Sequence, residues 1–255
     1  MPPTQSTFRK DMVRRQILAL AYLLLVPGVI LAQDTDPEEP PRWSGTAEVS
    51  ALATSGNSDT RTFGLGGEVV FDPGTWKWLG RAAYVETEAD DVLRARSQSA
   101  LLEVSRAVSE RLDVYGRGGY LRDLFAGIER RIATEAGLAY QVIATGAHTL
   151  EVLGGVGFTQ EQRSTGDDLS LATANGTGRY AWALTETSAL TEEAAFVAAL
   201  NSGDDWRLTN EIAATAALSS LLSLKVSQKL SYLNRPVPGF RKTDTIFAAA
   251  LVANF

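Results

Sequence analysis

The chain has 255 residues, of which 45% are apolar and 21% charged, and a formal net charge of −6. This composition indicates one large or two small folded domains and argues against intrinsic disorder. One His and no Cys exclude disulfides, iron–sulfur clusters, thiolate zinc sites and sites with two His ligands, so no cofactor is expected. The acidic balance also argues against a nucleic-acid partner, which would need clustered Lys and Arg.

The N-terminal residues predict a secretory signal peptide over residues 1–32. Four basic residues precede an uncharged run from Ile17 to Leu31. This run of about 15 residues is shorter than the roughly 20 that span a bilayer, which favours a cleaved leader over a membrane anchor. We expect cleavage near Ala32. The following residues 33–42 hold three prolines and predict an extended periplasmic linker.

From Trp43 to Phe255, segments in which every second side chain is apolar alternate with turn residues, and no apolar run approaches 18 residues. A period of two is typical of β-strands with one apolar face. Counting the segments gives twelve, at about residues 43–54, 60–71, 76–88, 95–108, 111–123, 129–142, 147–161, 168–184, 188–200, 205–218, 221–233 and 243–255.

These segments predict an all-β fold. Because their number is even, as in single-chain bacterial barrels, we expect an antiparallel up-and-down transmembrane β-barrel over residues 43–255. With both ends in the periplasm, the longer connections face outward, among them residues 88–94, 163–168 and 234–243. Aromatic residues near the segment ends predict an interfacial girdle: Trp43, Phe71, Trp76, Trp78, Tyr84, Tyr180, Trp182, Trp206, Tyr232 and Phe255. Three polar residues fit the lipid-facing side poorly, namely Glu192, Asn210 and Gln228.

Three stretches carry a family resemblance: WSGTAEVSALATSGNSDT (43–60), RDLFAGIERR (122–131) with GLAY (137–140), and PGFRKTDTIFAAALVANF (238–255). They resemble a family of bacterial salt-induced outer-membrane proteins whose function is not established. The resemblance implies an outer-membrane β-barrel and no particular reaction. The last segment, with Phe247, Leu251 and Phe255 on one face, also resembles the signal that the barrel-assembly machinery reads.

The opposite face of the segments is charged, and it would line the barrel lumen. It carries eight basic residues and nine acidic ones: Lys77, Arg81, Arg117, Arg131, Arg179, Arg207, Lys225 and Lys229 with Glu48, Glu68, Glu103, Asp113, Glu135, Glu151, Glu193, Glu211 and Asp244. An ion-selective pore more often shows a ring of one sign. The nearly equal numbers of basic and acidic residues predict ion pairs that fill the lumen. A role of individual charged residues in permeation or binding remains an alternative.

Catalytic and metal-binding interpretations rest on few residues. His148 is the one candidate general base, for a lipid-acting hydrolase of the outer membrane, but no Ser is placed beside it, so no catalytic residue is predicted. Asp doublets at 90–91, 167–168 and 204–205 could hold divalent cations against lipopolysaccharide, although turns favour Asp for its own backbone hydrogen bonds. The glycines at 64–67 and 154–157 predict positions of close packing or bends within strands.

The sequence as a whole therefore predicts a non-enzymatic, monomeric protein of the bacterial outer membrane. It would be an envelope component or a narrow channel for small solutes or ions, with a link to salt or osmotic stress implied by the resemblance. Its expected partners are outer-membrane lipid, lipopolysaccharide and the barrel-assembly machinery. Two alternatives remain: the lipid-acting hydrolase, and a secreted soluble β-protein that binds a ligand and covers its apolar faces with protein.

Overall fold

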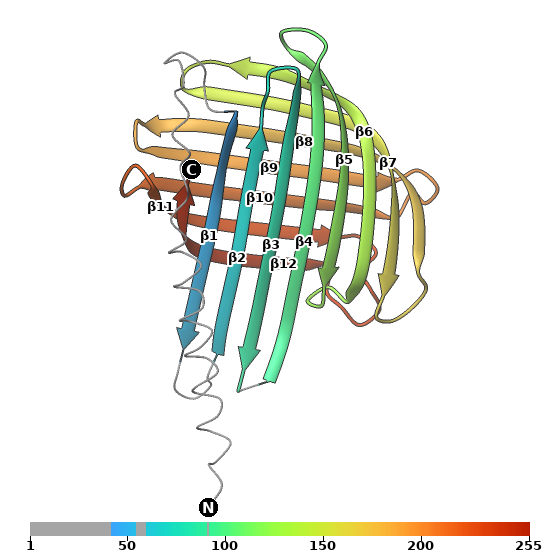
Figure 1. Cartoon of the computed structure of the whole chain (residues 1–255). Helices are drawn as coiled ribbons and strands as arrows, with labels where there is room; N and C mark the ends of the chain where they lie inside the picture. The colour runs from blue at the N-terminus through green and yellow to red at the C-terminus, as the bar shows by residue number, and fades with distance from the viewer. Residues whose placement is uncertain (1–41, 55–59, 91) are drawn as a thin grey trace, which may run out of the picture. The chain divides into compact units, whose positions relative to one another are not determined.

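The computed structural model describes residues 42–54, 60–90 and 92–255, which form a closed barrel of twelve antiparallel strands (Figure 1). Each strand pairs with its neighbours in the sequence, and the last pairs with the first, which confirms the predicted up-and-down barrel. The strands are β1 (Trp43–Thr54), β2 (Thr60–Phe71), β3 (Trp76–Ala89), β4 (Val92–Ala107), β5 (Leu112–Asp123), β6 (Ile128–Ala144), β7 (His148–Arg163), β8 (Leu169–Thr185), β9 (Ser188–Ala199), β10 (Trp206–Ala217), β11 (Leu222–Leu233) and β12 (Thr243–Asn254).

The part of the chain that the structure describes contains no helix long and apolar enough to cross a membrane. The predicted signal peptide, all but the last residue of the predicted linker, and Asp91 lie outside the described residues.

One predicted connection is wrong. Residues 88–94 were expected to form an outward loop, but Ala89 pairs with Val92 and leaves a connection of two residues. Asp90 adopts a φ of 51°, a left-handed conformation that Asp tolerates better than most residues. The alternation of apolar and polar side chains breaks down here because these residues are mostly charged. The sequence pattern therefore gave no sign that the two strands of the hairpin continue through them.

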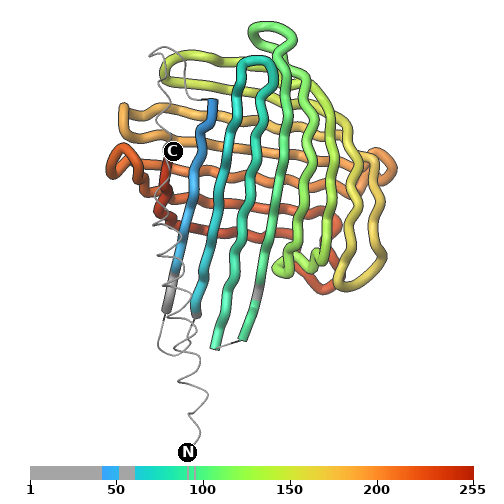
Figure 2. Tube along the Cα trace, viewed as in Figure 1, coloured from blue at the N-terminus to red at the C-terminus, as the bar shows by residue number. Residues whose placement is uncertain are grey.

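The two ends of the barrel differ in the length of their connections. We call the end with Trp43 and Phe255 the terminal rim; its turns have at most four residues. At the opposite end, the loop rim, the connection between β11 and β12 has nine residues (234–242). Figure 2 traces the chain as successive hairpins between these rims, with the C-terminus beside the start of β1.

The barrel closes between β1 and β12. Four residue pairs are in register there, from Thr46 with Asn254 to Val49 with Leu251. The ladder is extended at the terminal rim, because the Gly45 N–H donates to the Phe255 carbonyl (2.8 Å) and the Phe255 N–H donates to the Gly45 carbonyl (3.0 Å). Phe255 therefore contributes its backbone to the closure that removes both sheet edges.

The outward face of the strands is mostly apolar and exposed. Phe247, Leu251 and Phe255, the predicted assembly signal, share this face and are 75%, 42% and 67% exposed. Buried side chains include polar ones, such as Glu103 at 7% and Glu161 at 3%. The distribution of polarity is thus the reverse of that in a water-soluble protein.

Aromatic side chains gather at the two rims. At the terminal rim the Trp43 ring stacks on Phe71, with centroids 4.4 Å apart. At the loop rim Trp206 stacks on Tyr232, with centroids 4.9 Å apart. These pairs contain four of the aromatic residues that the sequence pattern assigned to a girdle, and such a band is typical of barrels whose rims meet a membrane interface.

The polar residues that fitted the outward face poorly do lie on it. Glu192 is opposite Ile212, and Ile212 is opposite Gln228, so the strands keep their register. The Asn210 side-chain amide donates to Glu192 Oε1 at 2.8 Å. The two groups satisfy each other, which lowers the cost of placing them on this face.

Candidate functional site

The charges predicted to face the lumen all lie on the inward face of their strands. Glu68 of β2 is opposite Arg81 of β3, and Arg117 of β5 lies between Glu103 of β4 and Glu135 of β6. The same alternation holds along the other strands for Glu48, Lys77, Asp113, Arg131, Glu151, Arg179, Glu193, Arg207, Glu211, Lys225, Lys229 and Asp244.

Arg179 joins strands across the lumen. Its two terminal nitrogens contact Glu103 at 2.9 and 2.7 Å, a bidentate pair between β8 and β4, which are not neighbours in the sheet. The same guanidinium reaches Glu151 at 3.3 Å and Glu193 at 3.2 Å. Arg81, on β3, contacts Glu193 from the other side at 3.0 Å. Fork geometry and ionised partners make such contacts strong and specific.

Arg117 extends this central cluster. It contacts Glu135 at 2.7 Å and the Thr177 hydroxyl at 3.1 Å, and lies 3.8 Å from Glu103. Tyr115 donates its hydroxyl to the same Glu135 carboxylate. The central cluster, which we define as Arg81, Arg117 and Arg179 with their carboxylate partners, therefore ties strands together through the middle of the barrel.

A second cluster lies nearer the loop rim around Glu161, which is 3% exposed. Glu161 accepts from Arg131 at 2.7 Å and from Arg163 at 2.6 Å, while Arg207 is 3.7 Å away and also donates to Thr159 at 3.1 Å. Neither Glu161 nor Arg163 was predicted. Counting by twos from Glu151 along β7 would have identified Glu161, but Arg163 lies beyond the predicted end of that segment.

A third group lies beside the closing strands. Lys225 of β11 contacts Glu48 of β1 at 3.0 Å and Glu211 of β10 at 3.6 Å. To reach β1 it passes over β12, where the small, buried Ala250 is its register partner. Four predicted lumen charges make no ion pair within the described residues: Lys77, Asp113, Lys229 and Asp244.

The β11–β12 connection (234–242), which we call the strap, lies at the loop rim, the end predicted to face outward, and folds onto the barrel mouth there. Its Val237 is 1% exposed and forms an apolar cluster with Ala126 and Ile128, against which Phe240 also packs. Ala126 and Ile128 belong to the β5–β6 hairpin, half the barrel away in strand order. The strap therefore crosses the mouth.

Further contacts hold the strap in place. Thr165 donates its hydroxyl to the Pro238 carbonyl at 2.8 Å, and Arg163 donates to the Arg235 carbonyl at 3.3 Å. Gly127 has a φ of +70°, and a Cβ there would lie 2.5 Å from the Phe240 ring. Any larger residue at position 127 would thus push the strap away as well as strain the turn.

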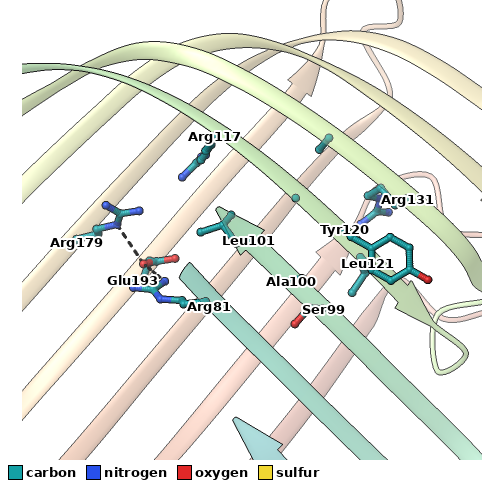
Figure 3. Close-up of a pocket in the computed structure, with 12 residues that line it drawn as sticks. Arg81, Ser99, Ala100, Leu101, Arg117, Tyr120, Leu121, Arg131, Arg179 and Glu193 are labelled. Carbon is teal, nitrogen blue, oxygen red and sulfur yellow. Dashed lines mark hydrogen bonds and ion pairs between the residues drawn. The ribbon is translucent and has the colours of Figure 1, made fainter. Parts of the chain in front are cut away.

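A cavity of about 270 Å³ remains beside the central cluster. Arg81, Arg117, Arg131 and Arg179 line it, together with Glu193 (Figure 3). Each of these four guanidiniums already has a carboxylate partner. The cavity is therefore a gap within a charge-paired interior, because its cations are neutralised by the wall that holds them.

His148 belongs to the aromatic band at the terminal rim. Its Nδ1 lies 2.8 Å from the Tyr180 hydroxyl, and its ring stacks on Trp182 with centroids 5.5 Å apart. The contacts of the imidazole are thus aromatic and phenolic. The Ser partner that a hydrolase would need does not contact this ring within the described residues.

The remaining motifs serve local structure. Asp168 accepts a hydrogen bond from the Arg163 backbone at 3.2 Å, and the described residues contain no group of three Asp, Glu or His placed to hold a metal ion. At Gly155 a Cβ would lie 2.8 Å from the Tyr115 hydroxyl. This close approach confirms the predicted close packing at Gly155, whereas a Cβ at Gly154 would meet nothing within 4 Å.

Solved structures similar to this chain include porins and a translocator domain, by their descriptions. The translocator domain of the autotransporter NalP from Neisseria meningitidis is 13% identical, with 98% of this chain and 96% of that chain covered and a TM-score of 0.45. The KdgM porin is 7% identical over 83% and 99%, with a TM-score of 0.44. An anion-selective porin from Comamonas acidovorans is 10% identical over 84% and 98%, with a TM-score of 0.42.

These TM-scores are below 0.5, so the fold assignment rests on the strand pairing itself. No curated protein matches the chain. A family described as a protein of unknown function, DUF481, matches residues 47–255, and this description contains no reference to salt induction. Because the match covers most of the chain, including all twelve strands at least in part, the protein belongs to the DUF481 family.

Proposed function

We propose that this protein is a non-enzymatic, monomeric β-barrel of the bacterial outer membrane. The observation that carries the proposal is its reversed polarity: outward residues such as Val226 and Phe247 are 53% and 75% exposed, whereas Glu103 and Thr173 are 7% and 1% exposed. A lipid-facing barrel needs an apolar exterior and a polar interior. A secreted soluble β-protein would cover its apolar face with a second layer, and the described residues contain none.

We further propose that the barrel is closed in this conformation, as an envelope component or as a narrow channel for small solutes or ions. Twelve strands leave room for an aqueous path. Here the ion pairs of the central cluster occupy the interior, and the strap crosses the mouth. A path for solute requires the strap to move and the paired charges to separate.

Fractionation tests the proposed location. We expect the mature protein, cleaved near Ala32, in the outer-membrane fraction, and an unheated sample that migrates differently from a boiled one on a denaturing gel. In detergent it should have the mass of one chain plus micelle. Recovery of the unheated mature protein from the soluble periplasm would contradict the proposal.

Planar-bilayer recordings at several salt concentrations test whether the barrel is closed. We expect small or absent conductance for the unmodified protein, and a clear increase for the double variant Arg81→Ser with Arg117→Ser, which removes two guanidiniums from the central cluster. Val237→Asp, which places a carboxylate in the apolar cluster of the strap, should raise it further when combined with these changes. Arg106→Ser, on the outward face beside Trp76, is the control.

Large, steady conductance of the unmodified protein would instead make it a general porin.

The link with salt or osmotic stress rests on the family resemblance. We expect the amount of this protein in its native envelope to rise at high osmolarity, as measured by quantitative immunoblotting against total outer-membrane protein. An unchanged amount would remove this part of the proposal.

A further inference from the structure

Three arginines face outward near the loop rim on consecutive strands. Arg96 lies on β4, Arg122 on β5 and Arg130 on β6. Arg122 is opposite Gln98 and Arg130 is opposite Gln162, positions that alternate with the inward lumen charges. These side chains therefore belong to the outer surface of the barrel and not to its interior.

The register brings the three arginines close together. Between Leu121 and Asp123 the β5–β6 pairing shifts by one residue, so that Arg122 is opposite both Glu129 and Arg130. On the other side of β5, Arg96 is the next outward residue on β4 beyond the register partner of Arg122. Like charges on neighbouring strands repel each other unless an anion lies between them.

The arginines differ in their partners. Arg96 contacts Glu86 at 2.7 Å. Within the described residues, Arg122 and Arg130 make neither a hydrogen bond nor an ion pair, and Glu129 beside them is likewise unpaired. In contrast, the arginines of the central cluster each have carboxylate partners. The outward patch therefore carries cationic donors that the protein does not itself satisfy.

The surroundings of the patch are those of a membrane boundary. Two residues from Arg122 toward the middle of the barrel, Tyr120 faces outward and is 38% exposed, and Ile132 stands in the same relation to Arg130 at 42%. The patch is also confined to one sector. At the loop rim of the opposite wall, the outward residues of the described strands carry no charge: Ser170, Ala172, Ala198, Trp206, Tyr232 and Thr243.

We propose that Arg96, Arg122 and Arg130 form a binding site for the phosphate groups of lipopolysaccharide. The inference rests on the proposed outer-membrane location, with the loop rim facing outward. A guanidinium binds phosphate through two parallel hydrogen bonds. In lipopolysaccharide the phosphates lie directly above the acyl chains. The phosphates would therefore contact the arginines, and the acyl chains would contact Tyr120 and Ile132.

The test uses the full mature protein purified in detergent and then incubated with lipopolysaccharide, with the same lipopolysaccharide after removal of its phosphates, or with phosphatidylglycerol. Bound lipid is counted by native mass spectrometry. We expect binding of intact lipopolysaccharide, and binding that is weaker by about tenfold or more for the double variant Arg122→Gln with Arg130→Gln, because charge-assisted contacts are lost. Removal of the phosphates should have an effect of the same size.

Arg106→Gln is the matched control, since Arg106 also faces outward on β4 but lies at the terminal rim over the Trp76 ring. It should bind lipopolysaccharide as the unmodified protein does. Equal binding by the double variant, an equal loss in the control, or equal binding of phosphatidylglycerol would each overturn the inference. A protein that fractionates with the soluble periplasm would instead overturn the proposed location, so the two failures are distinguishable.

Discussion

At the scale of single residues, Glu161 is, among the described residues, the carboxylate in the lumen with the most ion-pair partners. Its buried carboxylate faces Arg131, Arg163 and Arg207. Removing one partner of a buried ion pair leaves charge uncompensated, which costs more than the intact pair contributes. Three arginines share this one carboxylate, so loss of its charge would leave all three without this anionic partner.

We therefore expect Glu161→Gln to lower the free energy of unfolding by about 3 kcal/mol. Urea titration followed by the gel shift between folded and unfolded barrel measures this loss. Glu110→Gln is the control, because Glu110 lies exposed in the β4–β5 turn and should change stability by less than about 0.5 kcal/mol. Equal stabilities of the two variants would show that Glu161 does not hold the cluster together.

At the scale of elements, the last strand closes the barrel. The β1–β12 ladder has four register pairs, whereas β1 and β2 are in register from Trp43 with Phe71 to Thr54 with Thr60. The two hydrogen bonds between Gly45 and Phe255 are thus a large part of this closure. An open sheet edge is costly where no water can satisfy its backbone groups.

Deletion of Phe255 should consequently deplete the protein from the outer membrane. Phe255→Lys keeps the backbone bonds and should cause the same depletion because the barrel-assembly machinery would no longer meet the aromatic side chain. Immunoblots of membrane fractions measure the depletion. The control is Leu218→Lys, which adds the same charge at a 62% exposed position in the β10–β11 turn of the same rim and should leave the amount unchanged. Normal levels and folding of the Phe255 variants would show that the terminal pattern is accidental.

At the scale of the whole molecule, the environment of each face decides which substitutions are tolerated. Val226 is outward and Thr191 is inward, two positions from Glu193. In a membrane, Val226→Lys should destabilise the barrel by about 2–4 kcal/mol, because a charge then faces hydrocarbon, whereas Thr191→Lys gains carboxylate neighbours. Folding in lipid vesicles and in detergent micelles, followed by urea titration, compares the two variants. A destabilisation of Thr191→Lys as large as that of Val226→Lys would contradict a lipid-facing exterior.

The sequence by itself determined the strands and their two faces. Alternation is a local property, since adjacent side chains on a strand point in opposite directions. It therefore predicted twelve strands with bounds mostly within two residues of those observed. It also assigned residues such as Arg179 and Glu103 to the inward face. It failed at residues 88–94, where four charged residues interrupt the alternation of apolar and polar side chains.

The tertiary structure alone decided which groups meet. Arg179 and Glu103 are 76 residues apart and lie on β8 and β4, so their contact depends on how the closed sheet curves around its interior. The strap likewise needs the β5–β6 hairpin opposite it before Val237 can be buried. Local patterns fix the direction of a side chain, but its partner across the lumen depends on the closure and stagger of all twelve strands together.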